Sequence, residues 1–293
     1  MKNAFVHVSA PKKGASASAS QAVNPSPHRW LIKSMGTSFS LAIVGTSPSD
    51  TKKLVTAIKD DFARIESRLS ILLPDSEISQ WRRGHLRDAH LSMETREVIA
   101  ACDLAEELTD GLFSAQRDGQ YDPTGYVKGW ALARAGRRLD DSGVGSYYLN
   151  GGGDVIARGS GPDDTPWRIG VAHPFRPGEL AAVLTVPPGD RRPIAVATSG
   201  KGDHSHISCP VDGWRPTLST VTVVGHHIAL VNMASIAALA AGRLGSEASR
   251  DLVQRLGLEA FGFDEDQRPW RTDGLPKYAL PAQSPQPASA DSN

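Results

Sequence analysis

The spacing of apolar residues changes near Gly143, and this change limits the folds that the chain can adopt. Before it, apolar residues recur every three or four positions, as in amphipathic helices. We expect helices from a cap at Ser49 and Asp50 to about Leu73, over 94–109 and over 127–139. Two strands, 30–36 and 38–45, precede these helices and meet at a Met-Gly-Thr turn.

After Gly143, short apolar runs and period-two alternation predict strands. The expected strands are 146–150, 154–157, 167–172, 180–186, 194–198, 219–224 and one near 259–263. Two further helices, 228–241 and 246–256, are expected late in the chain. Helices early, strands in the middle and helices late favour an α+β fold over a doubly wound sheet. We expect a helical N-terminal part, a mostly antiparallel mixed sheet and flanking C-terminal helices.

The two ends of the chain have the composition of disordered tails. Residues 1–28 and 281–293 are rich in Ala, Ser and Pro and poor in large apolar residues. The segment between them, 29–280, is therefore expected to form a single domain.

Charge and cysteine content narrow the function classes. The 32 basic residues balance 32 acidic ones, so no overall field favours nucleic acid or an anionic membrane. No run reaches the about 18 apolar residues of a membrane-spanning helix, and the N-terminus lacks the apolar core of a signal peptide. Cys102 and Cys209 stand in different contexts, which argues against a structural disulfide. A cytoplasmic location, without membrane insertion, is the expectation.

One stretch, 195–213, combines a strand end with two histidines. A strand that stops before Ser199 and Gly200 can present N–H groups and a hydroxyl to a phosphate. His206 follows closely enough to act as a base. The alternative interpretation is a hairpin turn that contains His204 and His206, and the stretch alone favours the hairpin, because short motifs often match by chance.

Two other segments allow a binding or a structural interpretation. The run Asn150-Gly151-Gly152-Gly153-Asp154 separates two expected strands; its glycines suit either close approach to a ligand or a tight hairpin. Lys128 opens a helix, where positive charge favours an anion, although a solvated lysine is the plainer interpretation.

Several common sites are excluded by spacing. There is no G-x-G-x-x-G motif followed by a helix and no P-loop lysine motif, and Ser199 does not stand in G-x-S-x-G. His226 and His227 have the character of a loop pair, because the histidines lack the spacing of zinc ligands.

Taken together and in this order, the motifs resemble the FAD:protein FMN transferases, the ApbE-type flavin transferases, in a form similar to the actinobacterial one. The motifs are Met35-Gly36-Thr37; 65–70 with 74–79; Gly111-Leu112-Phe113; 122–131; 150–154; 167–171; 197–200; His206-Ile207 with Pro210; and 219–224. Each motif is weak alone, but nine in the right order are specific.

The resemblance implies an ApbE-like fold and a Mg²⁺-dependent enzyme. Such an enzyme transfers FMN from FAD to a Ser or Thr hydroxyl of an acceptor flavoprotein and releases AMP. The residues that the resemblance assigns to FAD are Met35, Gly36, Asp122, Lys128, Asn150, Gly151, Gly152, Gly153, Asp154, Ser199 and Gly200. It assigns the role of general base to His206, and charge neutralisation by a metal ion, Lys128 or backbone donors fits the splitting of a pyrophosphate.

The sequence departs from the family at the implied metal ligands. The family's Asp and Thr, four residues apart on one helix, correspond here to Asn232 and Ile236, and the third ligand is the carbonyl of Val127. Asn232 offers only a neutral oxygen and Ile236 offers none, so weak Mg²⁺ binding is expected. Gly202 and Cys209 also replace a Tyr and an Asp.

These departures keep other functions open. The chain could be an FAD-binding member without turnover, an FAD pyrophosphatase, or a scaffold that docks a protein partner. The transferase remains the leading prediction, because the resemblance spans nearly the whole folded part.

Overall fold

A computed structural model describes residues 27–117, 119–161, 164–187, 190–200 and 217–279. Most of the two expected tails lies outside these ranges. His28, placed in the N-terminal tail by composition, already belongs to the first strand.

The centre of the fold is an eight-stranded sheet in the order β1-β2-β5-β6-β9-β10-β11-β12, with every neighbouring pair antiparallel. Its strands are β1 (His28–Ser34), β2 (Thr37–Val44), β5 (Ser146–Gly151), β6 (Asp154–Arg158), β9 (Ile194–Gly200), β10 (Leu218–Gly225), β11 (Glu259–Asp264) and β12 (Pro269–Arg271). Two smaller hairpins are β3 (Gln116–Arg117) with β4 (Gln120–Tyr121), and β7 (Arg168–Ala172) with β8 (Leu180–Thr185).

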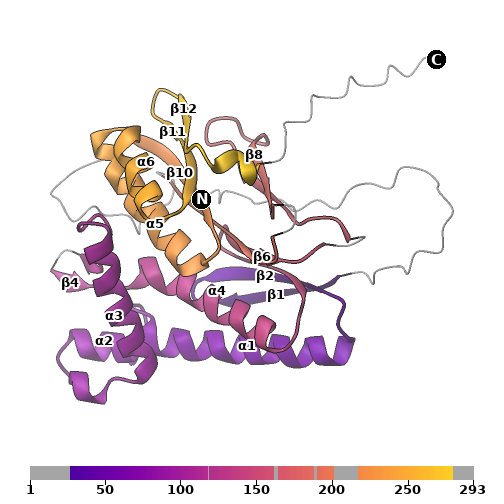
Figure 1. Cartoon of the computed structure of the whole chain (residues 1–293). Helices are drawn as coiled ribbons and strands as arrows, with labels where there is room; N and C mark the ends of the chain where they lie inside the picture. Colours follow the sequence, from indigo (N-terminus) through magenta and orange to yellow (C-terminus); the bar gives the residue numbers. More distant parts are fainter. Residues whose placement is uncertain (1–26, 118, 162–163, 188–189, 201–216, 280–293) are drawn as a thin grey trace, which may run out of the picture.

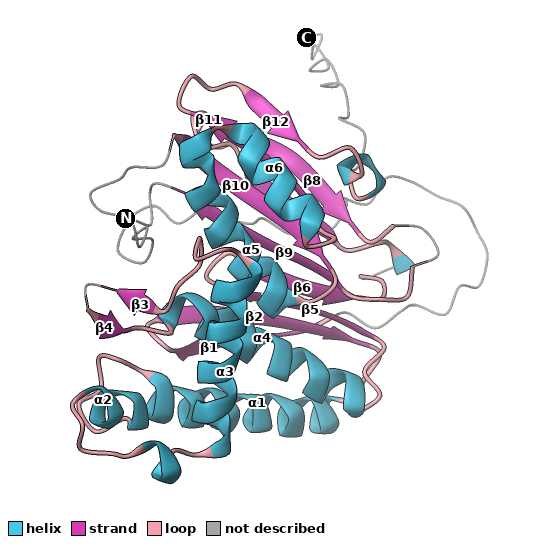
Figure 2. Ribbon diagram, turned by 60° about the vertical axis from the view of Figure 1, so that its left-hand side comes forward, coloured by secondary structure: helices cyan, strands magenta, loops and turns pink. Residues whose placement is uncertain are grey.

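Helices gather on one side of this sheet (Figure 1 and Figure 2). They are α1 (Pro48–Leu69), α2 (Glu77–Arg82), α3 (Met93–Leu108), α4 (Thr124–Asp141), α5 (Ile228–Ala241) and α6 (Ser246–Arg255), with short 3-10 turns η1 (Asp88–His90), η4 (Gly242–Leu244) and η5 (Leu275–Lys277). The β7–β8 hairpin and η5 lie toward the other side (Figure 1). The α+β prediction with a mostly antiparallel sheet is therefore confirmed. None of the helices in the described ranges has the length and apolar character that crossing a bilayer requires.

The alternation along the strands separates two apolar cores. On β5, Tyr147 and Leu149 pack with the helices, whereas Tyr148 packs with Trp167 beside the β7–β8 hairpin. Period-two side-chain direction thus gives each central strand two buried faces.

Several predicted boundaries were wrong by a few residues. Helix α1 is capped by Ser47, whose hydroxyl accepts from the Asp50 N–H, and ends at Leu69 rather than Leu73. Helix α4 begins at Thr124 rather than near Val127, with Pro123 at the N-cap position; Asp122, just before it, accepts hydrogen bonds from the N–H and hydroxyl of Thr124. Strand β12 was not expected; it is only three residues long and starts with Pro269.

Candidate functional site

The glycine run forms the turn between β5 and β6. Pairing closes at Gly151 and Asp154, and Gly152 and Gly153 have φ angles of 62° and 99°. The Asn150 side chain accepts from the Gly153 N–H at 3.0 Å, which fixes the turn. Gly151 is required for packing, because a Cβ there would collide with the Phe39 ring. The tight-hairpin interpretation is therefore confirmed, and the turn has no side chain at Gly152 to keep a ligand away.

The Met35-Gly36 turn between β1 and β2 lies beside this hairpin. Both residues have positive φ, 51° and 67°. The hydroxyl of the next residue, Thr37, is 3.2 Å from the position that a Cβ on Gly152 would take. The structure thus brings two turns, far apart in sequence, to one end of the sheet.

A buried carboxylate links this end of the sheet to two helices. Asp154 at the start of β6 is 2 % exposed, and its Oδ2 lies 3.0 Å from the ammonium of Lys128 on α4. The same oxygen accepts a 2.9 Å hydrogen bond from the amide Nδ2 of Asn232 on α5. Lys128 Nζ is also 3.7 Å from the Cβ position of Gly152. Lys128, Asp154 and Asn232, here called the Lys-Asp-Asn cluster, therefore join α4, β6 and α5 beside the glycine turn.

Two serines extend the polar contacts of α5. Ser235 donates to the Asn232 carbonyl at 2.8 Å, and its oxygen lies 2.9 Å from the Ser199 hydroxyl. Because the Ser235 proton is used on Asn232, Ser199 donates to Ser235. Ser199 and Gly200 both belong to β9 and pair with β10, so the expectation that the strand stops before Ser199 was wrong. A hydrogen bond to α5 turns the Ser199 side chain toward the cluster's helix.

Other candidate residues have structural partners or lie outside the described ranges. Asp122 accepts hydrogen bonds from Thr124 at the start of α4, and its Oδ2 lies 3.5 Å from Arg117 Nη1. His226 is near Pro193, Tyr278 and Asp190, as expected of a loop histidine. His206 and Cys209 fall in 201–216, outside the described residues.

Residues 35–117 and 114–262 match the model of the ApbE family. The chain belongs to the ApbE family. Comparison with curated proteins gave no match.

Solved structures of this family share the fold. The flavin transferase ApbE from Vibrio cholerae is 17 % identical, with a TM-score of 0.73, covering 86 % of this chain and 99 % of its own. The Thermotoga maritima ApbE protein is 20 % identical with a TM-score of 0.75, covering 87 % and 100 %. The apo flavinyl transferase ApbE from Pseudomonas stutzeri is 18 % identical with a TM-score of 0.71, covering 89 % and 100 %. The match therefore extends over nearly the full length of the related chains.

The residues at the implied magnesium position do not fit that ion. Asn232 uses its Nδ2 on Asp154, and its Oδ1 is a buried neutral oxygen that accepts no hydrogen bond from the described residues. Ile236 packs against the apolar core and has no ligand atom. No group of three His, Cys, Asp or Glu side chains suited to a metal occurs among the described residues. Mg²⁺ prefers several carboxylate and water oxygens in octahedral geometry, which this set does not supply.

Sequence reasoning missed three contributors to the site: Thr37, Gly129 and Ser235. Thr37 stands within a motif that was singled out, so the signal was present. Gly129 also stands within a motif, 122–131, but its role arises from the packing of α4 against α5. Ser235 carries no motif signal, because its role arises from the contact of α5 with Ser199 on β9.

Proposed function

We propose that the chain binds FAD at the Lys-Asp-Asn cluster and transfers FMN to a Ser or Thr hydroxyl of an acceptor flavoprotein, releasing AMP. The observation that carries this proposal is the position of Lys128. Its ammonium lies beside the side-chain-free Gly152 turn and is held by a buried carboxylate. An ammonium next to an open backbone turn is suited to a diphosphate.

The activities by which two of the similar proteins are named support the choice of a flavin as ligand. The Vibrio cholerae protein is called a flavin transferase and the Pseudomonas stutzeri protein a flavinyl transferase. Family membership and the shared fold make flavin transfer the reaction class that this site serves best.

In the proposed reaction the acceptor hydroxyl oxygen attacks the phosphorus of the FMN half of FAD. A new O–P ester bond forms, the bond from that phosphorus to the bridging oxygen breaks, and AMP leaves with the bridging oxygen. His206 is proposed to accept the hydroxyl proton. Lys128 stabilises the negative charge that develops on the diphosphate.

Asp154 and the two turns are proposed to position the dinucleotide. Asp154 keeps the lysine directed toward the turn, and Asn150 holds the Gly152-Gly153 conformation. Met35, Gly36, Ser199 and Gly200 are proposed to border the nucleotide from the neighbouring strands. Asp122 is proposed to act indirectly, because its hydrogen bonds with Thr124 fix the start of α4, the helix that carries Lys128.

The experiment is incubation of the full chain with FAD and an acceptor flavoprotein domain. We expect covalent flavin fluorescence on the acceptor and AMP in equal amount. An acceptor variant with Ala in place of the modified Ser or Thr is the control, and it should remain unlabelled. FAD binding with neither label nor AMP would contradict transfer and leave a non-catalytic binder; AMP without label would identify a pyrophosphatase. Absence of binding would leave the docking scaffold.

A further inference from the structure

We propose that the nucleotide site of this chain works without a divalent cation and that the ammonium of Lys128 supplies the positive charge. This inference rests on the proposed flavin-binding function. Its basis is the packing at the implied metal-ligand positions. Asn232 and Ile236 stand at these positions, and their side chains pack between α4, β6 and α5.

The orientation of Asn232 is dictated by its neighbours. Its Nδ2 faces the Asp154 carboxylate at 2.9 Å; a flipped amide would place two acceptor oxygens against each other. The amide oxygen therefore points toward Gly129, 2.9 Å from the position of a Cβ on that residue. A carboxylate at position 232 would instead face the Asp154 carboxylate, and the two like charges would repel unless a cation lay between them. Asn232 thus donates a hydrogen bond to the buried Asp154 carboxylate, which then needs no metal ion to balance a second carboxylate beside it.

The second ligand position is filled by an apolar side chain. Ile236 lies four residues after Asn232, on the same face of α5. Its Cδ1 is 3.3 Å from the Cβ position of Gly125, and Phe113 borders the same space. A methyl group packed between α4 and Phe113 neither coordinates a cation nor leaves room for the water ligands that Mg²⁺ retains.

The positive charge beside Asp154 is the ammonium of Lys128. Asp154 Oδ2 receives both the ammonium and the Asn232 amide, so this oxygen is already satisfied by protein donors. The Lys128 side chain is 33 % exposed, in contrast to the 3 % exposed side chain of Asp154. The lysine can therefore reach a phosphate while the buried carboxylate fixes its direction. In this arrangement Asp154 is a positioning residue.

The first test is FAD titration of the full chain, followed by flavin fluorescence, in excess EDTA and in millimolar Mg²⁺. We expect the two dissociation constants to agree within about twofold. A loss of affinity of about tenfold or more in EDTA would overturn the inference. No binding under either condition would contradict the proposed function, and the metal readout below would still decide the inference.

The second test reads the metal directly. Mn²⁺ is titrated into the protein and the free-ion signal is followed by electron paramagnetic resonance. We expect the free Mn²⁺ signal to stay unchanged when a stoichiometric amount of wild-type protein is present. Loss of that signal would overturn the inference. The double variant Asn232→Asp, Ile236→Thr should remove the signal, and Mg²⁺ should raise its thermal unfolding midpoint. Ile236→Thr alone, which adds a hydroxyl without the carboxylate, should show neither effect. If the double variant does not fold, the wild-type Mn²⁺ titration remains decisive.

Discussion

At the contact between α4 and α5, Gly129 leaves the space that the Asn232 side chain occupies. A Cβ on Gly129 would lie 2.8 Å from the Asn232 Cβ and 2.9 Å from its Oδ1. These distances are shorter than real Cβ contacts, so one of the two helices would have to move. Gly129 therefore leaves the room that the Asn232 side chain needs to place its amide against Asp154.

The variant Gly129→Ala should lower the free energy of unfolding by about 1–3 kcal/mol, the usual cost of overpacking. It should also weaken FAD binding, because the Asn232 amide is displaced from Asp154. Urea denaturation measures the first effect and FAD titration the second. Gly145→Ala is a matched control: a Cβ there meets no atom within 4 Å, and both quantities should stay close to wild type. Equal stability of the two variants would contradict the packing argument.

Individual site residues were predictable only where a motif contains them. The resemblance to the family implies that Lys128 and Asp154 line one pocket, and Lys128 Nζ lies 3.0 Å from Asp154 Oδ2. Spacing cannot reveal that the Asn232 amide donates to a carboxylate 78 residues away, because this bond depends on the packing of α5 against β6. The proposed role of His206 stays a prediction.

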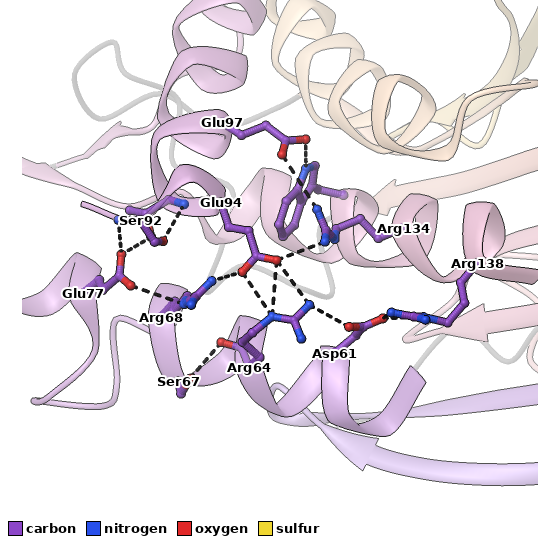
Figure 3. A network of polar contacts seen from close by, with 12 residues as sticks. Asp61, Arg64, Ser67, Arg68, Glu77, Ser92, Glu94, Glu97, Arg134 and Arg138 are labelled. Atoms are coloured by element: carbon purple, nitrogen blue, oxygen red, sulfur yellow. Dashed lines mark hydrogen bonds and ion pairs between the residues drawn. The ribbon is translucent and has the colours of Figure 1, made fainter. Parts of the chain in front are cut away.

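At the scale of elements, ion pairs tie the N-terminal helices together (Figure 3). Glu94 on α3 pairs with Arg64 and Arg68 on α1 and with Arg134 on α4. Asp61 on α1 also lies 2.6 Å from Arg138 on α4. Because the Glu94 side chain is only 14 % exposed, its carboxylate is less screened by solvent than an exposed one would be. The network fixes how α1 and α3 support α4, the helix that carries Lys128.

The variant Glu94→Gln should lower the free energy of unfolding at neutral pH by about 2 kcal/mol, since it leaves several arginines without their carboxylate. Burial alone would raise the pKa of Glu94, but the hydrogen bonds and charges of Arg64, Arg134 and Arg68 outweigh burial and hold this pKa below its ordinary value. The stabilisation is thus present above the ordinary glutamate pKa and lost as the pH falls through the lowered one. The difference between variant and wild type should shrink in that acidic range. Urea denaturation as a function of pH measures it.

Glu107→Gln is the matched control for this prediction, because Glu107 is exposed on the same helix. It should change the free energy of unfolding by less than about 0.5 kcal/mol. A Glu94→Gln effect no larger than that of the control would show that the network adds nothing to stability.

Element types were predictable, whereas their ends depended on hydrogen bonds that propensity does not contain. The periodicity of 50–69 predicts α1, but the Ser47 hydroxyl decides where the helix starts. Strand β9 continues through Gly200 because β10 offers it partners as far as Thr220. A glycine after a strand run was read as a stop, and tertiary pairing prevailed over that local signal.

At the scale of the whole molecule, the described residues form two apolar cores, one on each side of the sheet. Leu184 on β8 is fully buried in the core beneath the β7–β8 hairpin, whereas Lys128 and Asn232 lie on helices of the other side. The sequence pattern predicted a mostly antiparallel sheet with flanking helices, but not that both faces of the sheet are covered. It could not predict the strand order. Strand β6 pairs with β9, although β7 and β8, which form a separate hairpin, lie between them in the sequence.

The variant Leu184→Ala should lower the free energy of unfolding by about 3 kcal/mol through the cavity it leaves. Its affinity for FAD should remain that of wild type under native conditions, because the site lies on the helical side. Leu180→Ala on the same strand is the control; Leu180 is 46 % exposed, so the loss should be under about 1 kcal/mol. Weaker FAD binding by the Leu184 variant, at a temperature where it is folded, would contradict the separation of the two cores.

The central claim is that a flavin diphosphate binds beside Lys128 at the Gly152 turn. FAD titration of Lys128→Met against wild type tests it most directly, with Lys53→Met as the matched control. The Lys53 ammonium lies 3.6 Å from the Asp50 carboxylate in an exposed pair on α1, and Lys53 is not a member of the Lys-Asp-Asn cluster. We predict saturable binding by wild type and by Lys53→Met, and affinity at least about tenfold weaker for Lys128→Met, the usual effect of removing a charge-assisted hydrogen bond. Equal affinity of all three proteins for FAD would contradict the account.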